Sequence, residues 1–122
     1  MEERRKYVRI PENSKISYKC VSKEHIDEQL TKDVSQGGIR FVVHDFIPKD
    51  SYLKMRLTLS RTSASFEAMV RVVWTRRIPY KDGYEVGVQF VDISPQAVQL
   101  IVNYIKVTID ERKKSDNKDG SK

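Results

Sequence analysis

Two short groups of residues carry side chains whose types and spacing suit ligand recognition. The first is Arg5-Lys6-Tyr7-Val8-Arg9, in which two arginines are four positions apart. That separation places both guanidinium groups on one side of an extended segment, and also on one side of a helical turn. Guanidinium groups bond in pairs to phosphate oxygens or to O6 and N7 of guanine, and they stack on base faces. A solvated basic arm is the alternative interpretation, because basic termini are common.

The second group is Asp33-Val34-Ser35-Gln36-Gly37-Gly38. In an extended backbone Asp33 and Ser35 share a face, and the two glycines allow positive φ and a close approach of a ligand to the main chain. A carboxylate accepts from two donors at once, so Asp33 complements the edge of guanine that presents an N–H beside an amino group. The alternative is an Asx-type turn that leads into a strand.

Other residues offer little for catalysis. His25 and His44 have no cysteine or second histidine at ligand spacing, so no metal site is expected. The sequence has neither a phosphate-binding glycine loop between strand and helix nor a nucleophile elbow. Cys20 alternates with Ile16 and Tyr18, which indicates a thiol that faces the core. The sequence therefore predicts a protein that is not an enzyme and that needs no cofactor.

Composition sets the class of protein. The chain has 122 residues, 39% of them apolar, which suits one domain with one modest core. Lys and Arg number 23 against 17 Asp and Glu, so the net charge is +6. This charge favours an anionic partner but also fits an ordinary solvated surface. No apolar run reaches the ~20 residues of a membrane helix, and charged residues follow Met1 directly, so a cytoplasmic location is predicted.

Apolar and polar residues alternate in several segments, as they do in half-buried strands. The positions expected to face inward are Ile16, Tyr18 and Cys20; Ile39, Phe41 and Val43; Leu53, Met55, Leu57 and Leu59; Phe66, Ala68, Val70, Val72 and Trp74; and Tyr84, Val86, Val88 and Phe90. The polar stretch 22–32 is expected to be a loop. Residues 76–83, which contain Pro79, Asp82 and Gly83, are expected to form a hairpin connection.

The periodicity changes to helical after the last strand. Ser94 suits the N-cap and Pro95 the first helical position, and a stripe at helical spacing follows: Ala97, Leu100, Ile101, Tyr104, Ile105 and Thr108. We therefore expect an all-β fold with a C-terminal helix, in which five or six antiparallel strands close into a barrel. The expected divisions are a flexible N-terminal ligand-binding arm over 1–13, the barrel and helix over 14–109, and a disordered charged tail over 110–122.

Taken in order, Arg5-x-x-x-Arg9 and Asp33-x-Ser35-x-x-Gly38 resemble the two-part signature of the PilZ family of cyclic di-GMP receptors. Arg71-Val72-Val73-Trp74, the segment 84–90 and the terminal helix also resemble later elements of that family. The resemblance extends over roughly residues 3–108, and no motif position departs from the family pattern.

The resemblance implies a six-stranded antiparallel β-barrel of the PilZ type, whose N-terminal arm folds over cyclic di-GMP on the barrel surface. Arg5 and Arg9 would bind the phosphates and guanine O6 and N7. Asp33 and Ser35 would bind a guanine edge, and Gly38 would provide the close backbone contact. The expected partners are cyclic di-GMP and an unidentified effector protein.

Three further positions follow from the same resemblance. The residue type at Arg4 influences whether one ligand binds or an intercalated pair, and a basic residue there favours the pair. Trp74 and Arg76 are further candidate ligand contacts. Trp74 would alternatively cap the core, because it continues the inward-facing stripe. Gly87, in the middle of a strand, is expected to mark a bulge or close packing.

Two other functions compete with this one. A net charge of +6 and a β-barrel also suit a protein that binds single-stranded nucleic acid. Such proteins present aromatic side chains on a basic sheet face. Here the strand aromatics fall at inward-facing positions, namely Phe41, Phe66, Trp74, Tyr84 and Phe90. A protein-interaction module that binds no ligand would not need both arginines. The sequence therefore favours a cyclic di-GMP receptor that neither binds nucleic acid nor inserts into a membrane.

Overall fold

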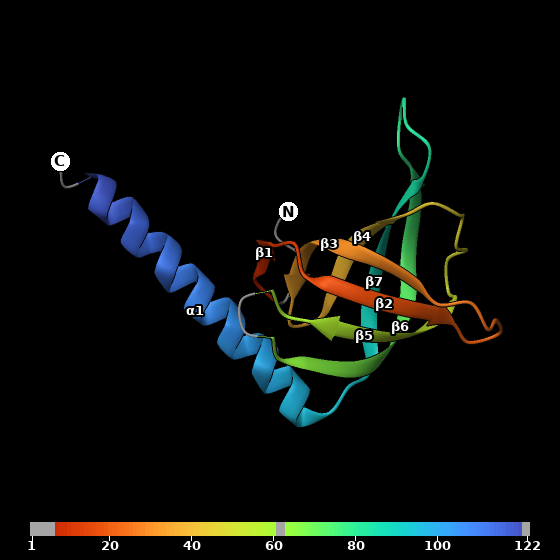
Figure 1. Ribbon diagram of the computed structural model, residues 1–122, viewed down its shortest axis with the longest axis horizontal. Coiled ribbons are helices and arrows are strands. Elements are labelled where there is room, and N and C mark those ends of the chain that lie inside the picture. Colours follow the sequence, from red (N-terminus) through yellow and green to blue (C-terminus); the bar gives the residue numbers. More distant parts are fainter. Residues whose placement is uncertain (1–6, 61–62, 121–122) are drawn as a thin grey trace.

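The computed structural model describes residues 7–60 and 63–120, which form seven strands and one helix (Figure 1). The elements are β1 (Arg9–Pro11), β2 (Lys15–Cys20), β3 (Asp27–Ser35), β4 (Gly38–Val43), β5 (Tyr52–Thr58), β6 (Ser65–Arg77), β7 (Tyr84–Asp92) and α1 (Pro95–Gly120).

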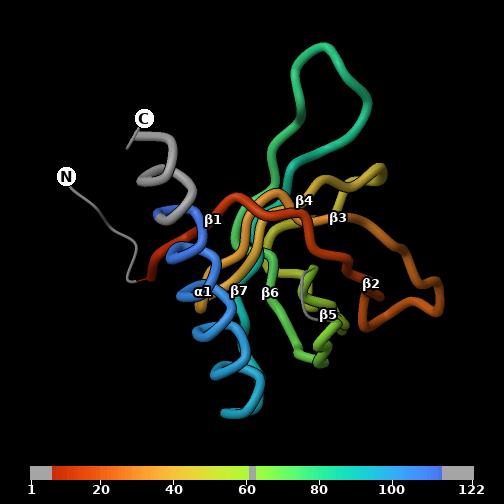
Figure 2. The backbone as a smooth tube through the Cα atoms, turned by 60° about the vertical axis from the view of Figure 1, so that its left-hand side comes forward, coloured from red at the N-terminus to blue at the C-terminus, as the bar shows by residue number. Residues whose placement is uncertain are grey.

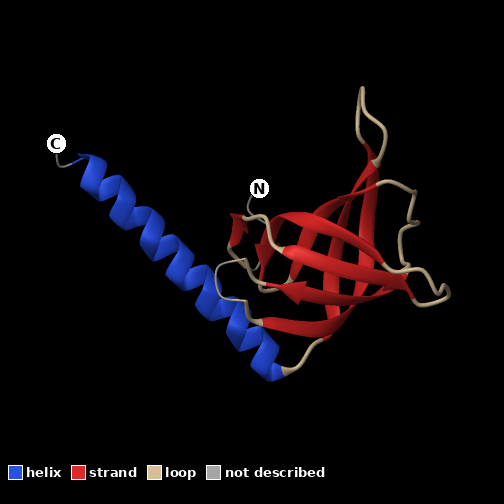
Figure 3. Cartoon of the chain, viewed as in Figure 1, coloured by secondary structure: helices blue, strands red, loops and turns tan. Residues whose placement is uncertain are grey.

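Six of the strands form a closed antiparallel barrel (Figure 3). The sheet runs in the order β3-β2-β5-β6-β7-β4, and a further pairing between β3 and β4 closes it. β1 is an additional short strand that pairs with β3 outside this closed ring. The all-β barrel with a C-terminal helix predicted from the sequence is therefore confirmed. Because the sheet is closed, each of the six strands has a paired neighbour on both sides.

The barrel interior is filled by the alternating apolar residues of the strands. Buried side chains come from every strand of the ring and include Ile16, Tyr18, Val34, Ile39, Phe41, Leu53, Leu57, Val70, Val72, Val86 and Val88. Cys20 is partly buried and packs against this cluster. Each fully buried aliphatic side chain contributes about 1.5–3 kcal/mol. This rigid interior fixes the positions of the side chains on the outer face.

The prediction of a loop over residues 22–32 was wrong, because β3 begins at Asp27. The first half of β3 pairs with β2, with Lys15 opposite Leu30 and Tyr18 opposite Asp27. Its side chains remain largely exposed in this half, so no apolar alternation marks the strand in the sequence. Backbone hydrogen bonds to β2 hold this part of β3 in place.

Trp74 departs from the inward-facing stripe to which the sequence analysis assigned it. Val70 and Val72 are fully buried, whereas Trp74 is 37% exposed. The register between β6 and β7 shifts between Val72 and Trp74. A β-bulge inserts one residue and turns the following side chains to the other face. The aromatic residues of this chain therefore do not all face inward.

α1 begins as predicted: Pro95 is its first residue, and the amide of Ala97 donates to Oγ of Ser94 at 3.1 Å. It lies beside β1 at one end of the barrel, opposite the β2–β3 and β4–β5 connections (Figure 2). Three of its own side chains, Ala97, Ile101 and Tyr104, are buried. Within the described residues, no helix is both long enough and apolar enough to cross a membrane.

Both ends of the barrel domain differ from the expected boundaries. α1 continues to Gly120, whereas a disordered tail was expected from residue 110. Glu, Arg and Lys are strong helix formers, and Arg112 anchors this part of the helix by donating to the carbonyl of Pro11 at 2.9 Å. At the other end, Arg9–Pro11 forms β1, and Ile10 is only 3% exposed. The expected arm is thus part of the fold from Arg9 onward.

Candidate functional site

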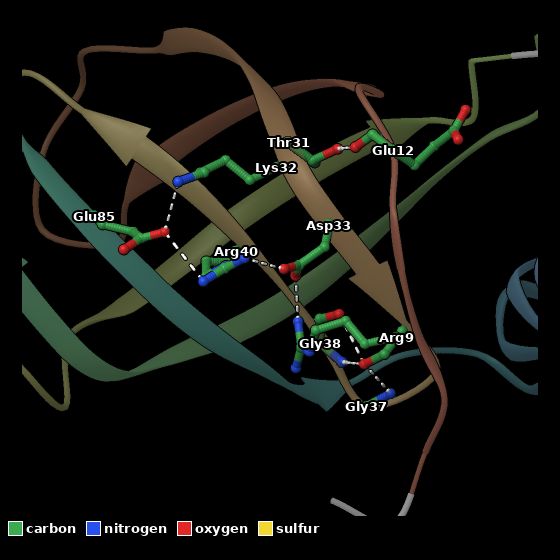
Figure 4. A network of polar contacts seen from close by, with 10 residues as sticks. Arg9, Glu12, Thr31, Lys32, Asp33, Gly37, Gly38, Arg40 and Glu85 are labelled. Atoms are coloured by element: carbon green, nitrogen blue, oxygen red, sulfur yellow. Dashed lines mark hydrogen bonds and ion pairs between the residues drawn. The ribbon is translucent and has the colours of Figure 1, made fainter.

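The carboxylate of Asp33 is held between two arginines (Figure 4). Arg9, in β1, donates from NH1 to Oδ1 of Asp33 at 2.5 Å. Arg40 lies directly opposite Asp33 in the β3–β4 register, and its NH2 is 2.7 Å from Oδ2. Asp33 is only 4% exposed. Each oxygen of this buried carboxylate therefore has one guanidinium partner, as a buried charge requires.

A second buried carboxylate, Glu85 of β7, lies on the other side of Arg40. NH1 of Arg40 is 3.3 Å from Oε2 of Glu85, and Nζ of Lys32 is 3.0 Å from the same oxygen. Arg76, opposite Glu85 in the β6–β7 register, donates to the other oxygen. Burial alone would raise the pKa of Glu85, but the hydrogen bonds from Arg76 and Lys32 and the charge of Arg40 hold it below its ordinary value.

Ser35 organises the turn between β3 and β4. Its Oγ accepts from the amides of Gly37 at 3.2 Å and Gly38 at 3.1 Å, and it donates to the carbonyl of Gly38 at 3.1 Å. The side chain is buried within the turn. The hydroxyl of Ser35 thus has its hydrogen bonds inside the protein, and it shapes the turn that leads from β3, which carries Asp33, into β4.

A shallow depression of about 120 Å³ lies beside the two carboxylates and is lined by Arg9, Ile39, Arg40, Val73, Trp74, Gly87 and Val88. The indole of Trp74 covers Gly87, where a Cβ atom would lie 2.4 Å from its Cε2 and Nε1 atoms. Close packing, one of the two explanations expected for Gly87, therefore accounts for this glycine. The guanidinium carbon of Arg76 lies 5.5 Å from the centre of the Trp74 ring.

The electrostatics of this surface favour an anion. Four cationic side chains, Arg9, Lys32, Arg40 and Arg76, surround the two carboxylates and leave an excess of positive charge. All four are partly exposed, with between 25% and 66% of each side chain accessible. A separate cavity of about 490 Å³ lies between the β2–β3 and β4–β5 connections, and none of these four cations lines it.

The structure brings most of the predicted site residues together. Arg9 pairs with Asp33, and Ser35 and Gly38 form the adjoining turn. Trp74 lines the depression, and Arg76 lies near its ring. Arg4 and Arg5 lie outside the described residues. Sequence reasoning missed three members of the cluster, Lys32, Arg40 and Glu85. Arg40 and Glu85 each stand between two apolar, inward-facing residues, so alternation already placed them on the outer face.

Comparison with protein families identifies the chain. The model of the PilZ domain matches residues 3–106. The chain belongs to the PilZ domain family. No curated protein sequence matches it. The PilZ match includes both sequence motifs, β1 and the barrel, and it reaches into α1.

Solved structures share the PilZ fold of this chain at low sequence identity. MotI/DgrA, the Bacillus subtilis inhibitor of motility, has 19% identity and a TM-score of 0.78 over 91% of this chain and 54% of that chain. YcgR from Escherichia coli, in complex with c-di-GMP, has 14% identity and a TM-score of 0.76 over 94% of this chain and 50% of that chain. The MrkH–c-di-GMP complex of K. pneumonia has 18% identity and a TM-score of 0.80 over 93% of this chain and 56% of that chain. This PilZ chain thus spans about half the length of each.

Proposed function

We propose that this PilZ protein is a receptor for cyclic di-GMP that binds its ligand at the Arg9–Asp33 cluster without catalysing a reaction. The observation that carries the proposal is the buried Asp33 carboxylate with Arg9 at one oxygen, on a surface with excess positive charge. Membership of the PilZ family supports it, as do the c-di-GMP complexes of YcgR and MrkH.

The two motif residues complement opposite features of the ligand. Arg9, which lies at the start of a short strand and is 25% exposed in its side chain, can turn its guanidinium to a phosphate or to guanine O6 and N7. Asp33 can then accept from the N–H and the amino group on the other guanine edge. Both contacts are charge-assisted and partly shielded from water, so each should contribute substantially to affinity.

Calorimetric titration with cyclic di-GMP tests the receptor proposal. We expect wild-type protein to bind, and Arg5→Ala, Arg9→Ala and Asp33→Ala each to weaken binding by about tenfold to a hundredfold. Cyclic di-AMP should bind far more weakly, because adenine carries an amino group in place of O6 and lacks the amino donor beside its ring edge. Arg56→Ala is the matched control, since Arg56 pairs with Glu67 on an exposed surface of β5 and β6. Unchanged affinity in Arg9→Ala, or equal binding of both dinucleotides, would overturn the proposal.

We further propose that the ligand orders the segment before β1 and so changes the surface next to α1. Tyr7 and Val8 line an apolar groove of about 360 Å³ together with Gln36 and with Val102, Ile105, Lys106 and Ile109 of α1. Movement of Arg9 toward a phosphate would therefore alter a groove on the helix. This ligand-dependent groove is the surface that we assign to an effector protein.

Amide hydrogen exchange tests the ordering step. Ligand should slow exchange at residues 4–8 strongly, since pairing with phosphates immobilises the arm. The strands of the barrel should change little, and the amides that β1 pairs with β3 should already be protected without ligand. Strong protection of residues 4–8 in the free protein would show that the arm is ordered before the ligand arrives.

A further inference from the structure

The two arginines that hold Asp33 differ in how firmly they are themselves held. Arg9 belongs to a strand of three residues at the edge of the sheet, and among the described strands this strand pairs with β3 alone. Arg40 belongs to β4, which pairs with β3 on one side and β7 on the other within the closed barrel. The backbone of Arg40 is thus fixed on both sides, whereas that of Arg9 is not.

The side chain of Arg40 is also fixed at both of its terminal nitrogens. NH2 contacts Asp33 and NH1 contacts Glu85, and both of these carboxylate side chains are at most 6% exposed. Moving Arg40 to a ligand would remove a cation from two buried carboxylates at once, and an uncompensated buried charge is strongly unfavourable. Moving Arg9 would remove one of the two guanidinium partners of Asp33, which would keep Arg40.

We infer that Arg40 is a positioning residue, which holds the Asp33 carboxylate in place for the guanine edge when Arg9 turns to the ligand. Glu85 in turn anchors Arg40 from the side away from Asp33. A carboxylate has about four lone-pair sites, so Asp33 can accept from a guanine edge while it remains bonded to Arg40. This inference rests on the proposed function, and it assigns to Arg40 and Glu85 a part in base selectivity without contact to the ligand.

Base selectivity is the measurement that separates positioning from other roles. Cyclic di-IMP keeps O6 and N7 of its bases but lacks the amino group from which Asp33 would accept a hydrogen bond. Wild-type protein should bind cyclic di-GMP about tenfold or more tightly than cyclic di-IMP. In Arg40→Gln this preference should fall to a few-fold, chiefly through weaker binding of cyclic di-GMP. Glu85→Gln should shift the preference in the same direction, and adding Glu85→Gln to Arg40→Gln should change it no further.

Three other outcomes would contradict either this inference or the proposed function. If Arg40 contacted the ligand phosphate directly, Arg40→Gln would weaken the binding of both dinucleotides equally and leave the preference intact. That result would overturn the inference. Unchanged binding of both ligands would overturn it as well. Absence of cyclic di-GMP binding by the wild-type protein would overturn the proposed function together with this inference.

Controls keep folding separate from recognition. Arg56→Gln, which removes the exposed ion pair with Glu67, should leave both affinities unchanged. In Glu85→Gln, water can still hydrate the three cations that lose their carboxylate partner, because Lys32, Arg40 and Arg76 are partly exposed. This variant should therefore preserve the fold even if Arg40→Gln does not. Circular dichroism and thermal unfolding of each variant verify this before titration.

Discussion

Gly37 and Gly38 are crowded by different kinds of atoms, although they are neighbours in the same motif. A Cβ atom on Gly38 would lie 2.0 Å from the carbonyl oxygen of Val88, which belongs to the backbone of the paired strand β7. A Cβ atom on Gly37 would lie 2.8 Å from the ring of Tyr7, a side chain that can rotate. Packing against β7 therefore requires a glycine at position 38, besides any contact of Gly38 with a ligand.

We expect Gly38→Ala to lower the free energy of unfolding by about 1–3 kcal/mol, because the barrel must shift to admit the methyl group. Gly37→Ala should cost clearly less, since only the Tyr7 ring has to move. Chemical denaturation of the two variants in the absence of ligand measures the difference. Equal stabilities would show that the β7 backbone moves aside at as little cost as the Tyr7 ring. Gly38 would then not be needed for strand packing.

At single residues, the sequence indicated which side chains gather on the barrel surface but not how they pair. Arg9 and Asp33 were proposed as ligand contacts because motif and side-chain chemistry agree on them, and the structure pairs them with each other. Arg40 and Glu85 were missed because their importance depends on register, which places Arg40 opposite Asp33 and Glu85 opposite Arg76. Alternation predicts the face on which a strand residue lies but not its neighbour on the next strand.

Among the elements, β1, the β5–β6 connection and α1 are joined by a polar cluster around Glu12. Oε2 of Glu12 accepts from the hydroxyls of Ser60 and Tyr104, each at 2.5 Å, and its Oε1 accepts from Arg112 at 2.9 Å. Burial raises the pKa of Tyr104, and the hydrogen bond to Glu12 raises it further, so the phenol stays a donor at neutral pH. Glu12 follows directly after β1, the strand that carries Arg9, so this cluster links β1 to the helix.

Tyr104→Phe should therefore destabilise the protein by about 1–3 kcal/mol, because it leaves a nearly buried carboxylate without one of its donors. Tyr80→Phe is the control, as Tyr80 lies fully exposed in the β6–β7 loop and should leave stability unchanged. Equilibrium unfolding in urea measures both. A Tyr104→Phe protein as stable as wild type would mean that the remaining partners of Glu12 hold it without the Tyr104 hydroxyl.

The elements that the sequence mispredicted share a physical cause. Both β3 and the position of Trp74 depend on contacts between strands: β3 starts as a polar strand held by β2, and the bulge before Trp74 appears only in the pairing of β6 with β7. Helix α1, in contrast, was predicted correctly at its start, because Ser94 and Pro95 act locally. Its continuation beyond residue 109 was not predicted, and there Arg112 bonds to Pro11, about a hundred positions away in the chain.

On the scale of the whole molecule, the barrel offers one outer surface where strands β1, β3, β4, β6 and β7 bring their polar residues together. Its four cations exceed its two carboxylates before Arg4 and Arg5 are counted. One cyclic di-GMP carries two phosphates, whereas an intercalated pair carries four. The positive charge, the partly exposed Trp74 and the Arg76 guanidinium near its ring favour the larger ligand.

We therefore predict that two cyclic di-GMP molecules bind per chain, and that Arg4→Leu shifts the stoichiometry toward one. Arg4 immediately precedes the first motif arginine, so its guanidinium would add charge and a stacking plane for the second ligand, and leucine offers neither. Calorimetry at high ligand concentration measures the ratio, with Lys6→Leu as the control for loss of one positive charge from the same segment. Analytical ultracentrifugation of the complex distinguishes a pair within one chain from a pair shared by two chains. A one-to-one titration of the wild-type protein under these conditions would show that Arg4 does not select the paired ligand.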